Sequence, residues 1–333
     1  MQALKAFGEG RLELVEVETP SICTGEMLIN PLFVGICGTD LDIVHSNIDP
    51  MYVNYPVTIG HEWCGLVIDF ASDVKNISIG DRVVVQGIIP CERCHECLTG
   101  NTNRCEIYDE YGFTRDGAGS SAVVAAERLI HKILPLVSNE SAALVEPAAV
   151  VMTGLLKSKP VPGAKVLIIG DGTIGLLTAK LVRSWLPTQI DMMGVRSQQA
   201  QLAKLAQVDN FLLASSPKGE KYDLVIEASG SKIGVDTALK RMVRGGKLLM
   251  LGFIGHEVSI PLVVDDIVNG DFSIYGSFGY TSEAWAKTVA LLNTGDLDLT
   301  FIVTHRFKLS DWQKAFDTLV TATAPRGKIV LIP

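Results

Sequence analysis

The sequence of 333 residues lacks a long hydrophobic run, a basic tract and any low-complexity segment. Its most apolar region, between Glu146 and Lys157, is shorter than the roughly 18 to 20 residues that a membrane-spanning helix needs. The formal net charge of −8 disfavours nucleic acid or an anionic membrane as a partner. Residues 1–20 alternate like a pair of strands and lack the apolar core of a secretion signal. These absences predict a cytoplasmic protein with no nucleic-acid or membrane partner.

Disulfides are not expected either. The seven cysteines are odd in number and cluster at short spacing in a chain without a secretion signal, a pattern that indicates metal binding. The length exceeds what one hydrophobic core usually serves, which predicts two domains.

A glycine turn, GDGTIG, is the feature around which the rest of the chain is organised. It follows the apolar run VLII and precedes a helix start, the context in which G-x-G-x-x-G predicts dinucleotide binding. Gly170 would make the turn, Gly172 would let the backbone approach a pyrophosphate, and Gly175 would let the helix pack on the strand. Thr173 and Ile174 begin the helix, whose free N–H groups attract phosphate. An ordinary β-turn-α unit is the alternative.

Strand-like and helix-like patterns alternate from this turn onward. Strands are expected at 165–169, 189–194, 222–228, 247–252 and 273–277, and helices near 174–185 and 198–206. This alternation predicts a parallel, doubly wound sheet. The short β-type runs at 28–34, 64–70 and 82–86 predict a compact β domain instead. Two amphipathic helices, 283–293 and 310–321, and a strand at 327–331 complete the chain.

A mixed set of metal-ligand residues lies inside the β-type region. Cys37 begins the motif Cys-Gly-Thr-Asp, and His61 and Glu62 end the motif Gly-His-Glu. Thiolate, imidazole and carboxylate are ligand types of zinc, and a catalytic zinc takes three protein ligands while leaving a fourth position open. Each motif is weak when taken separately, because a lone cysteine or histidine in a β domain is more often a core residue.

The motif C-x2-C-x2-C-x7-C is far more specific. It consists of Cys91, Cys94, Cys97 and Cys105 in a polar segment. Four thiolates at this spacing can close tetrahedrally around one Zn²⁺ and leave no position for substrate, which predicts a structural zinc. An iron–sulfur cluster is the alternative, disfavoured because the chain shows no partner domain for electron transfer. His95, between two of the cysteines, is expected to be a surface residue.

Together these motifs resemble one family. The order Cys37, His61, Glu62, four-cysteine lobe, Glu146 and glycine turn is similar to that of the zinc-dependent medium-chain alcohol dehydrogenase/reductase family, along essentially the whole chain. The nearest branch is the sorbitol (polyol) dehydrogenase-like one. In this chain a glutamate follows His61, and a Glu-Pro pair stands where liver-type alcohol dehydrogenases keep a cysteine ligand.

The resemblance implies an α/β fold in two domains. A doubly wound parallel Rossmann sheet, 151–280, would be inserted in a discontinuous GroES-like β-barrel catalytic domain, 1–150 and 281–333. It also implies a homodimer or homotetramer paired through an edge strand, for which the apolar segment 273–278 is the candidate.

The same resemblance implies a role for each residue of the mixed set. Cys37, His61 and Glu62 would hold a catalytic zinc, and Glu146 would be either a fourth ligand or the group that holds the zinc-bound water. Thr39 matches the family hydroxyl that hands on the substrate proton. Two zinc ions are therefore expected, one catalytic and one structural.

Two departures from the family pattern concern the surroundings of the catalytic zinc. Asp42 stands where many relatives carry the histidine of a proton relay, so we expect water or His45 to replace it. The stretch GAGSSAVV after Asp116 replaces a more usual glycine-glycine-aromatic pattern. Cys23 and Cys64 have no expected metal role and are predicted to be small buried residues.

The predicted cofactor is NADP(H) rather than NAD(H). Gly194 aligns with the ribose-binding acid of NAD-dependent relatives, and glycine does not repel a 2′-phosphate. Arg196 would pair with that phosphate, and Ser197 would donate a hydrogen bond to it. The alternative is that Asp191 serves as the acid and Arg196 is exposed to solvent. Further family contacts to the cofactor fall at Leu251, Gly252, Phe253, Ser277, Phe278 and Gly279.

The resemblance also implies the substrate class. A polyol, a sugar alcohol or another secondary alcohol and its ketone are the expected small-molecule substrates, with hydride passing to or from the nicotinamide. The alternative is an NAD-dependent dehydrogenase of a phosphorylated or aminated sugar alcohol, with Arg115 as a candidate anion contact. A zinc-free quinone reductase or a catalytically silent structural relative is disfavoured, because Thr39 and the metal-ligand residues are all retained.

Overall fold

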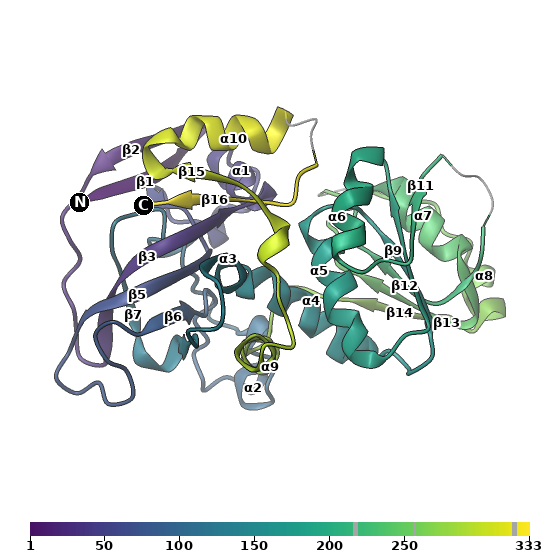
Figure 1. Ribbon diagram of the computed structural model, residues 1–333, viewed down its shortest axis with the longest axis horizontal. Coiled ribbons are helices and arrows are strands. Elements are labelled where there is room, and N and C mark those ends of the chain that lie inside the picture. The colour runs from purple at the N-terminus through teal and green to yellow at the C-terminus, as the bar shows by residue number, and fades with distance from the viewer. Residues whose placement is uncertain (216–218, 256–257, 322–324) are drawn as a thin grey trace. The chain divides into compact units, whose positions relative to one another are not determined.

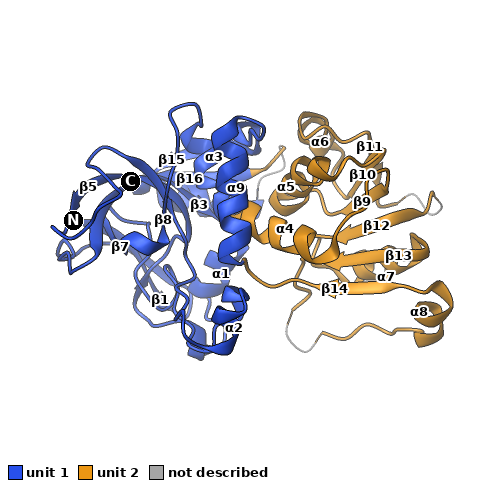
Figure 2. Cartoon of the chain, turned by 90° about the horizontal axis from the view of Figure 1, so that it is seen from below, with its two compact units in different colours: residues 1–146, 281–323, 328–333 blue, residues 147–280, 324–327 orange. Residues whose placement is uncertain are grey.

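The computed structural model describes residues 1–215, 219–255, 258–321 and 325–333, and the chain falls into two units (Figure 2). The first unit consists of Met1–Glu146, Thr281–Thr323 and Lys328–Pro333, and the second of Pro147–Tyr280 and Ala324–Gly327. The boundary lies between 146 and 147, where the sequence had suggested 150 and 151. The segment 325–327 groups with the second unit, although 281–333 was expected to belong wholly to the first.

The second unit is built on a six-stranded parallel sheet. Its strands are β9 (Lys165–Ile169), β10 (Gln189–Gly194), β11 (Asn210–Leu213), β12 (Tyr222–Glu227), β13 (Met242–Met250) and β14 (Ser273–Gly276). They lie in the order β11-β10-β9-β12-β13-β14, and every neighbouring pair is parallel. Numbered along the chain, this is the 3-2-1-4-5-6 order of dinucleotide-binding domains, which confirms the predicted doubly wound sheet.

Both faces of this sheet are covered. Val166, Leu167 and Ile168 are consecutive in β9, so their side chains point alternately to opposite faces, and all three are fully buried. Figure 2 shows the helices α5 (Thr173–Val182), α6 (Ala200–Leu205), α7 (Lys232–Lys240) and α8 (Val264–Gly270) packed around the strands. The sequence did not predict β11, α7 or α8. These elements are short, and apolar residues such as Ile233 and Val268 are exposed, which blurs their hydrophobic pattern.

The first unit contains a seven-stranded sheet that includes β3 (Glu26–Ile36). The other strands are β5 (Glu62–Phe70), β6 (Arg82–Val85), β7 (Val123–Ala126), β8 (Ile130–Lys132), β15 (Val303–Lys308) and β16 (Lys328–Ile332). β16 pairs antiparallel with β3, and Val330 lies opposite Gly35. Figure 1 shows the yellow β16 beside the purple β3. The first unit is therefore discontinuous in sequence because its last strand returns to one of its first.

A smaller sheet and several helices complete the first unit. β1 (Gln2–Gly8) lies between β2 (Arg11–Glu16) and β4 (Val57–Thr58), so the predicted N-terminal strand pair is confirmed. The helices are α1 (Gly38–Val44), α2 (His95–Leu98), α3 (Asn139–Ala143), α9 (Ser282–Thr294) and α10 (Trp312–Thr321), and α4 (Val145–Ser158) begins where the unit ends. No helix in the described part of the chain has both the length and the apolar character needed to span a membrane.

Candidate active site and metal centres

Cys37, His61 and Glu62 lie together where two neighbouring strands meet. Cys37 directly follows the end of β3, and Glu62 begins β5, the antiparallel neighbour of β3. The Sγ of Cys37 lies 3.5 Å from Nε2 of His61, and one donor atom of each residue lies within 4.8 Å of the others. His61 and Glu62 are only 5% and 3% exposed. We call Cys37, His61 and Glu62 the three-donor group, which is the kind of set that a catalytic zinc uses.

Asp40 lies behind His61. Its fully buried carboxylate accepts a hydrogen bond from the backbone N–H of Cys37 at 2.8 Å and lies 3.6 Å from Nδ1 of His61. Nδ1 of His61 faces a carboxylate, and Nε2 is directed at the sulfur of Cys37. This arrangement is common behind metal-bound histidines. Burial lowers the pKa of His61, but the charges of Cys37 and Asp40 outweigh it and raise the pKa well above its ordinary value. The sequence analysis missed Asp40, although a carboxylate in the first turn of a helix was visible in the motif.

Lys328 of β16 holds the third donor. Its ammonium forms an ion pair with Oε2 of Glu62, and both side chains are almost completely buried. Gly35 of β3 makes room for this pair, because a Cβ at that position would lie 2.5 Å from Oε2 of Glu62. Burial lowers the pKa of Lys328, but the charge of Glu62 outweighs it, so the pKa is raised and the lysine stays charged. This ion pair joins β5 to β16, two strands that lie far apart in the sequence.

Glu146 faces the three-donor group without being part of it. It lies in the first turn of α4, is 9% exposed, and is not one of the residues whose donor atoms lie within 4.8 Å of one another. Burial and the charge of Glu62 raise the pKa of Glu146 to about 8. Burial also raises the pKa of Glu110, which the sequence analysis missed and which accepts a hydrogen bond from Tyr108. Such crowding of buried carboxyls is costly, and a bound divalent cation would offset that cost.

The residues considered for proton transfer lie on α1. Thr39 is half-buried in its first turn, two residues after Cys37. Asp42 is exposed and accepts a hydrogen bond from the side chain of Asn47 at 3.2 Å, and His45 is exposed at the end of the helix.

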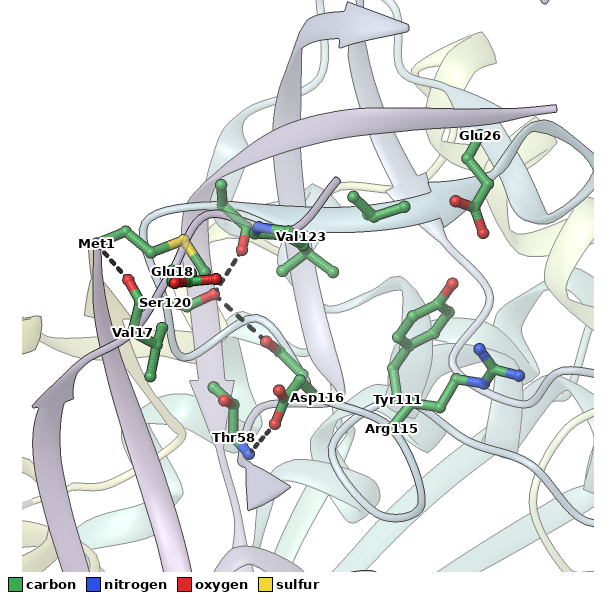
Figure 3. A pocket seen from close by; sticks show the side chains of 14 residues that line it. Met1, Val17, Glu18, Glu26, Thr58, Tyr111, Arg115, Asp116, Ser120 and Val123 are labelled. Carbon is green, nitrogen blue, oxygen red and sulfur yellow. Dashed lines mark hydrogen bonds between the residues drawn. The ribbon is translucent and has the colours of Figure 1, made fainter. Parts of the chain in front are cut away.

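Arg115 lines a pocket elsewhere in the first unit (Figure 3). The cavity has a volume of about 360 Å³, and its lining includes Tyr111, Glu26 and Asp116 but no member of the three-donor group. Arg115 is also paired with Asp109, whose carboxylate lies 2.5 Å from its Nε. Nothing in this arrangement supports Arg115 as an anion contact for a substrate.

The four cysteines converge in a lobe between β6 and β7. Their sulfur atoms lie within 4.8 Å of one another, and those of Cys91 and Cys97 are 3.9 Å apart. Backbone N–H groups donate to these sulfurs, from Cys94 to Cys91 at 3.4 Å and from Cys91 to Cys105 at 3.3 Å. His95 is exposed and is not part of the sulfur set, as expected. All four ligands needed for a closed tetrahedral site are therefore present.

The charges of this lobe favour a bound cation. Backbone N–H groups of Arg93 and Cys94 lower the pKa of Cys91 to about 6, whereas burial and the neighbouring thiols raise the pKa of Cys97 to about 12. The thiol of Cys91 thus loses its proton readily, whereas burial and the neighbouring thiols oppose the deprotonation of Cys97. A divalent cation removes this opposition, because each ligand binds it in the deprotonated form.

The two remaining cysteines differ from each other. Cys64 is buried as predicted, and its thiol donates to the carbonyl of Asn139 at 3.3 Å. Cys23 is exposed, so the prediction that it is buried was wrong. Cys23 precedes β3 in an irregular segment, where its backbone N–H donates to the carboxylate of Glu26 at 2.9 Å.

The glycine turn has the geometry that dinucleotide binding requires. Gly170 has φ of +123°, and a Cβ there would lie 2.7 Å from the backbone of Ala228. Gly172 precedes the first residue of α5, and a Cβ there would meet nothing within 4 Å, so this position faces open space. A Cβ at Gly175 would lie 2.0 Å from the carbonyl oxygen of Gly170, so only glycine lets α5 pack here. The open cradle at a helix N-terminus fits a pyrophosphate.

Asp171, inside the glycine turn, reaches the position beside Gly194. A Cβ on Gly194 would lie 2.4 Å from the Asp171 carboxylate, so this carboxylate fills the space that a side chain there would take. Its oxygens accept hydrogen bonds from the backbone N–H groups of Val195 and Arg196 and from the Arg196 guanidinium at 2.9 Å. Arg196 is thus held at the end of β10, and Ser197 follows it at the surface. The sequence analysis missed the role of Asp171.

Asp191 is not available to bind a ribose. It lies within β10, is 3% exposed, and its oxygens accept hydrogen bonds from Gln189, Asn210 and the hydroxyl of Tyr222. These contacts give it a structural role and disfavour it as the cofactor-binding acid.

The two segments expected at the other end of the cofactor lie close together. Phe253 follows β13 and Phe278 follows β14, and their rings are in edge contact with centroids 6.4 Å apart. Leu251, Gly252, Ser277 and Gly279 flank these rings in sequence. Both segments leave the carboxyl ends of parallel strands, where doubly wound sheets bind ligands.

Comparisons with known proteins agree with this architecture. Residues 24–135 match the alcohol dehydrogenase GroES-like domain, and residues 174–294 match the zinc-binding dehydrogenase family. L-threonine 3-dehydrogenase of Alteromonas mediterranea is 30% identical over 98% of each chain. D-arabinitol dehydrogenase 1 of Uromyces fabae is 27% identical over 92% of this chain and 90% of its own. A zinc-binding dehydrogenase from Sinorhizobium meliloti, solved bound to NADP, superimposes with a TM-score of 0.93, 26% identity and coverage of 100% of this chain and 99% of its own.

The chain combines a GroES-like unit, which carries two clusters of zinc-type ligands, with a Rossmann-type unit. This combination defines the class of zinc-binding dehydrogenases. This chain belongs to the zinc-type medium-chain family of alcohol and polyol dehydrogenases, and it is an oxidoreductase.

Proposed function

We propose that the protein transfers hydride between NADP(H) and a secondary alcohol/ketone pair, with a polyol or sugar alcohol as substrate. One observation carries this proposal. A thiol, an imidazole and a carboxylate converge within 4.8 Å, in a chain whose glycine turn opens onto a helix N-terminus. Their mixed chemistry is that of a catalytic rather than a structural zinc site.

The chain's own residues divide the work at this site. Cys37, His61 and Glu62 would hold the catalytic zinc, and Glu146 would be either a fourth ligand or the group that holds the zinc-bound water. When bound, this zinc supplies Lewis-acid chemistry that favours loss of the alcohol proton and polarises the ketone. Asp40 fixes the ring of His61, and Lys328 keeps the carboxylate of Glu62 in place. The structural zinc is held by the four cysteines of the lobe, which are Cys91, Cys94, Cys97 and Cys105.

Thr39 handles the proton in this scheme. Its hydroxyl receives the proton of the substrate alcohol and passes it to water, and the two side chains considered for the relay, Asp42 and His45, are exposed. The nicotinamide supplies the hydride chemistry, and the chain holds it in position.

Three parts of the second unit bind the cofactor. Gly170, Gly172, Thr173, Ile174 and Gly175 hold the pyrophosphate at the N-terminus of α5. Gly194, Arg196 and Ser197 contact the adenosine ribose and its 2′-phosphate, with Arg196 already held by Asp171. The nicotinamide end is contacted by Leu251, Gly252, Phe253, Ser277, Phe278 and Gly279. The NADP bound to the Sinorhizobium meliloti relative supports this cofactor choice.

A second substrate class has specific support. The relative from Alteromonas mediterranea is named L-threonine 3-dehydrogenase, and threonine is an amino alcohol. Glu110 and Glu146 are buried carboxyls that interact with the three-donor group, and their oxygens can accept hydrogen bonds from an ammonium group on the substrate. An aminated alcohol is therefore the alternative to a polyol, and it is favoured over a phosphorylated one because Arg115 lines a different pocket.

We also propose that the protein is a homodimer or homotetramer. β14 is the last strand of the parallel sheet, so one of its edges is unpaired within the described chain, and Ile274 is exposed there. Such an apolar edge favours pairing with a second copy. Light scattering at micromolar concentration should give a multiple of the mass of 35.9 kDa.

The test is a matrix of substrates and cofactors. Polyols, simple secondary alcohols and amino alcohols are each assayed with NADP and NAD, and kcat/KM is compared. We expect turnover of a polyol and at least a tenfold preference for NADP, since a charge-assisted hydrogen bond is worth about 1.5 to 3 kcal/mol. Arg196→Ala should remove most of that preference. Equal or better kcat/KM with NAD would contradict the cofactor choice, and turnover of amino alcohols alone would replace the polyol.

A further inference from the structure

A segment near the C-terminus is attached to the glycine turn. The side chain of Gln199 is 1% exposed and makes three hydrogen bonds to backbone groups. Its Oε1 accepts from the N–H of Arg326 at 2.8 Å, and its Nε2 donates to the carbonyl of Arg326 at 3.0 Å and to that of Asp171 at 2.5 Å. This buried amide therefore holds the backbone of Arg326 against the turn, 127 positions away from Gln199 in sequence.

Two arginines and one aspartate lie around this contact. The guanidinium of Arg196 is paired with Asp171 at 2.9 Å. Burial and the like charge of Arg196 lower the pKa of Arg326, and the charge of Asp171 opposes this shift. Two guanidinium groups and one carboxylate thus influence one another, and the formal charges of these three side chains sum to +1.

We propose that Arg326 is a second specificity-determining residue for the 2′-phosphate of NADP(H), acting together with Arg196, and that Gln199 positions it. This inference rests on the proposed preference for NADP(H). A phosphate monoester carries about 1.5 to 2 negative charges at neutral pH, which two guanidinium groups match better than one. Guanidinium groups also present forked donors that fit phosphate oxygens. Asp171 holds Arg196 in place, so part of the side-chain ordering is complete before the cofactor binds.

Binding of nucleotide fragments tests this without turnover. Adenosine 2′,5′-bisphosphate and adenosine 5′-diphosphate are titrated calorimetrically into the full-length protein and into Arg326→Ala, Arg326→Lys and Arg196→Ala. We expect Arg326→Ala to weaken the 2′,5′-bisphosphate about tenfold and to leave the 5′-diphosphate within about twofold, because only the former carries the recognised group. Arg326→Lys should retain part of the preference. Arg244, an exposed arginine in β13 of the same unit, provides the matched control Arg244→Ala, which should change neither affinity.

The outcomes separate the inference from the function on which it rests. If Arg196→Ala loses the preference and Arg326→Ala retains it, the role of Arg326 is refuted while the choice of NADP(H) stands. If the unaltered protein binds both nucleotides equally well, both fall. If Arg326→Ala weakens both nucleotides to the same extent, Arg326 supports the fold of the turn rather than the 2′-phosphate, and the inference is overturned.

Discussion

The three-donor group and the four-cysteine lobe lie in the same unit, but they are assembled in opposite ways. The lobe takes every ligand from residues 91–105, and its cysteines are all half-buried. The three-donor group takes its ligands from the ends of β3 and β5, and its supporting charges come from α1, α4 and β16. The lobe is therefore local in sequence, whereas the three-donor group exists only once distant strands have paired.

This difference separates what each site contributes. In the lobe, four sulfurs would leave no open position on a bound metal, so such a metal would contribute only to folding. The three-donor group brings three donor atoms together, and Asp40 and Lys328 lie against two of its members. Such a site can bind substrate at its remaining position. Substitutions should thus affect turnover at one site and stability at the other, and four predictions test this, from the largest expected effect to the smallest.

The largest effect is expected for Cys37→Ser. We expect kcat to fall on the order of a thousandfold, because metal stabilisation of developing charge is worth several kcal/mol and each 1.4 kcal/mol is about tenfold in rate. The melting temperature should change little. Cys23→Ser is the matched control, since it makes the same chemical change at an exposed site and should leave both quantities unchanged. Wild-type kcat in Cys37→Ser would show that the catalytic site has been placed wrongly.

Cys97→Ser should have the opposite signature. Loss of one of four ligands weakens metal binding, and that binding energy is folding energy for the lobe. We expect the melting temperature of the first unit to fall on the order of 10 °C, since about 1 kcal/mol shifts it by about 2–4 °C in a domain of roughly 150–250 residues. Calorimetry measures the melting, and kcat of the protein that remains folded should be reduced much less than in Cys37→Ser. A variant that melts normally but has no activity would reverse the two roles.

Lys328→Met is expected to destabilise the chelator-treated protein by about 3 to 5 kcal/mol, because it leaves the buried carboxylate of Glu62 without its partner. The loss should be smaller in the zinc-loaded protein, where the metal offsets the same charge. Urea unfolding with and without chelator measures both values. Lys314→Met, which removes an exposed lysine paired with Asp311, is the control and should cost less than about 1 kcal/mol. Equal losses with and without zinc would show that Lys328 does not act on a zinc ligand.

The smallest effect is expected for Asp40→Asn. The change keeps the shape of the side chain but weakens its hold on Nδ1 of His61, and changes behind a metal ligand typically cost about 10- to 100-fold in metal affinity or activity. Competition with a chromogenic chelator measures the affinity for zinc. Asp236→Asn, at an exposed position of α7, is the control. Unchanged zinc affinity in Asp40→Asn would show that contacts other than Asp40 orient His61.

The sequence sufficed for features whose geometry is local. The spacing of the four cysteines defines their lobe, and the glycine turn has the expected backbone geometry at Gly170 and Gly175, including the 2.0 Å approach at Gly175. The strand and helix alternation led to the correct doubly wound sheet for the same reason, since each element carries its own pattern. The branch of the family was read from single positions such as Glu62.

Features that depend on tertiary pairing could not be predicted in this way. Lys328 contacts Glu62 only because β16 returns to β3, and no spacing in the sequence signals this. Arg326 reaches the glycine turn through the side chain of Gln199, which from its position alone is a polar residue near the start of a helix. Asp171 was visible inside the turn, but its effect on Gly194 depends on the close approach of the glycine turn to the end of β10.

The zinc content of the purified protein tests the central claim of two separate sites most directly. Elemental analysis should give two zinc ions per chain for the unaltered protein and for Cys23→Ser. Cys37→Ser should retain one zinc and remain folded, with its single zinc removable only together with the fold. A content of one zinc or none in the unaltered protein, or loss of both ions in folded Cys37→Ser, would contradict the account.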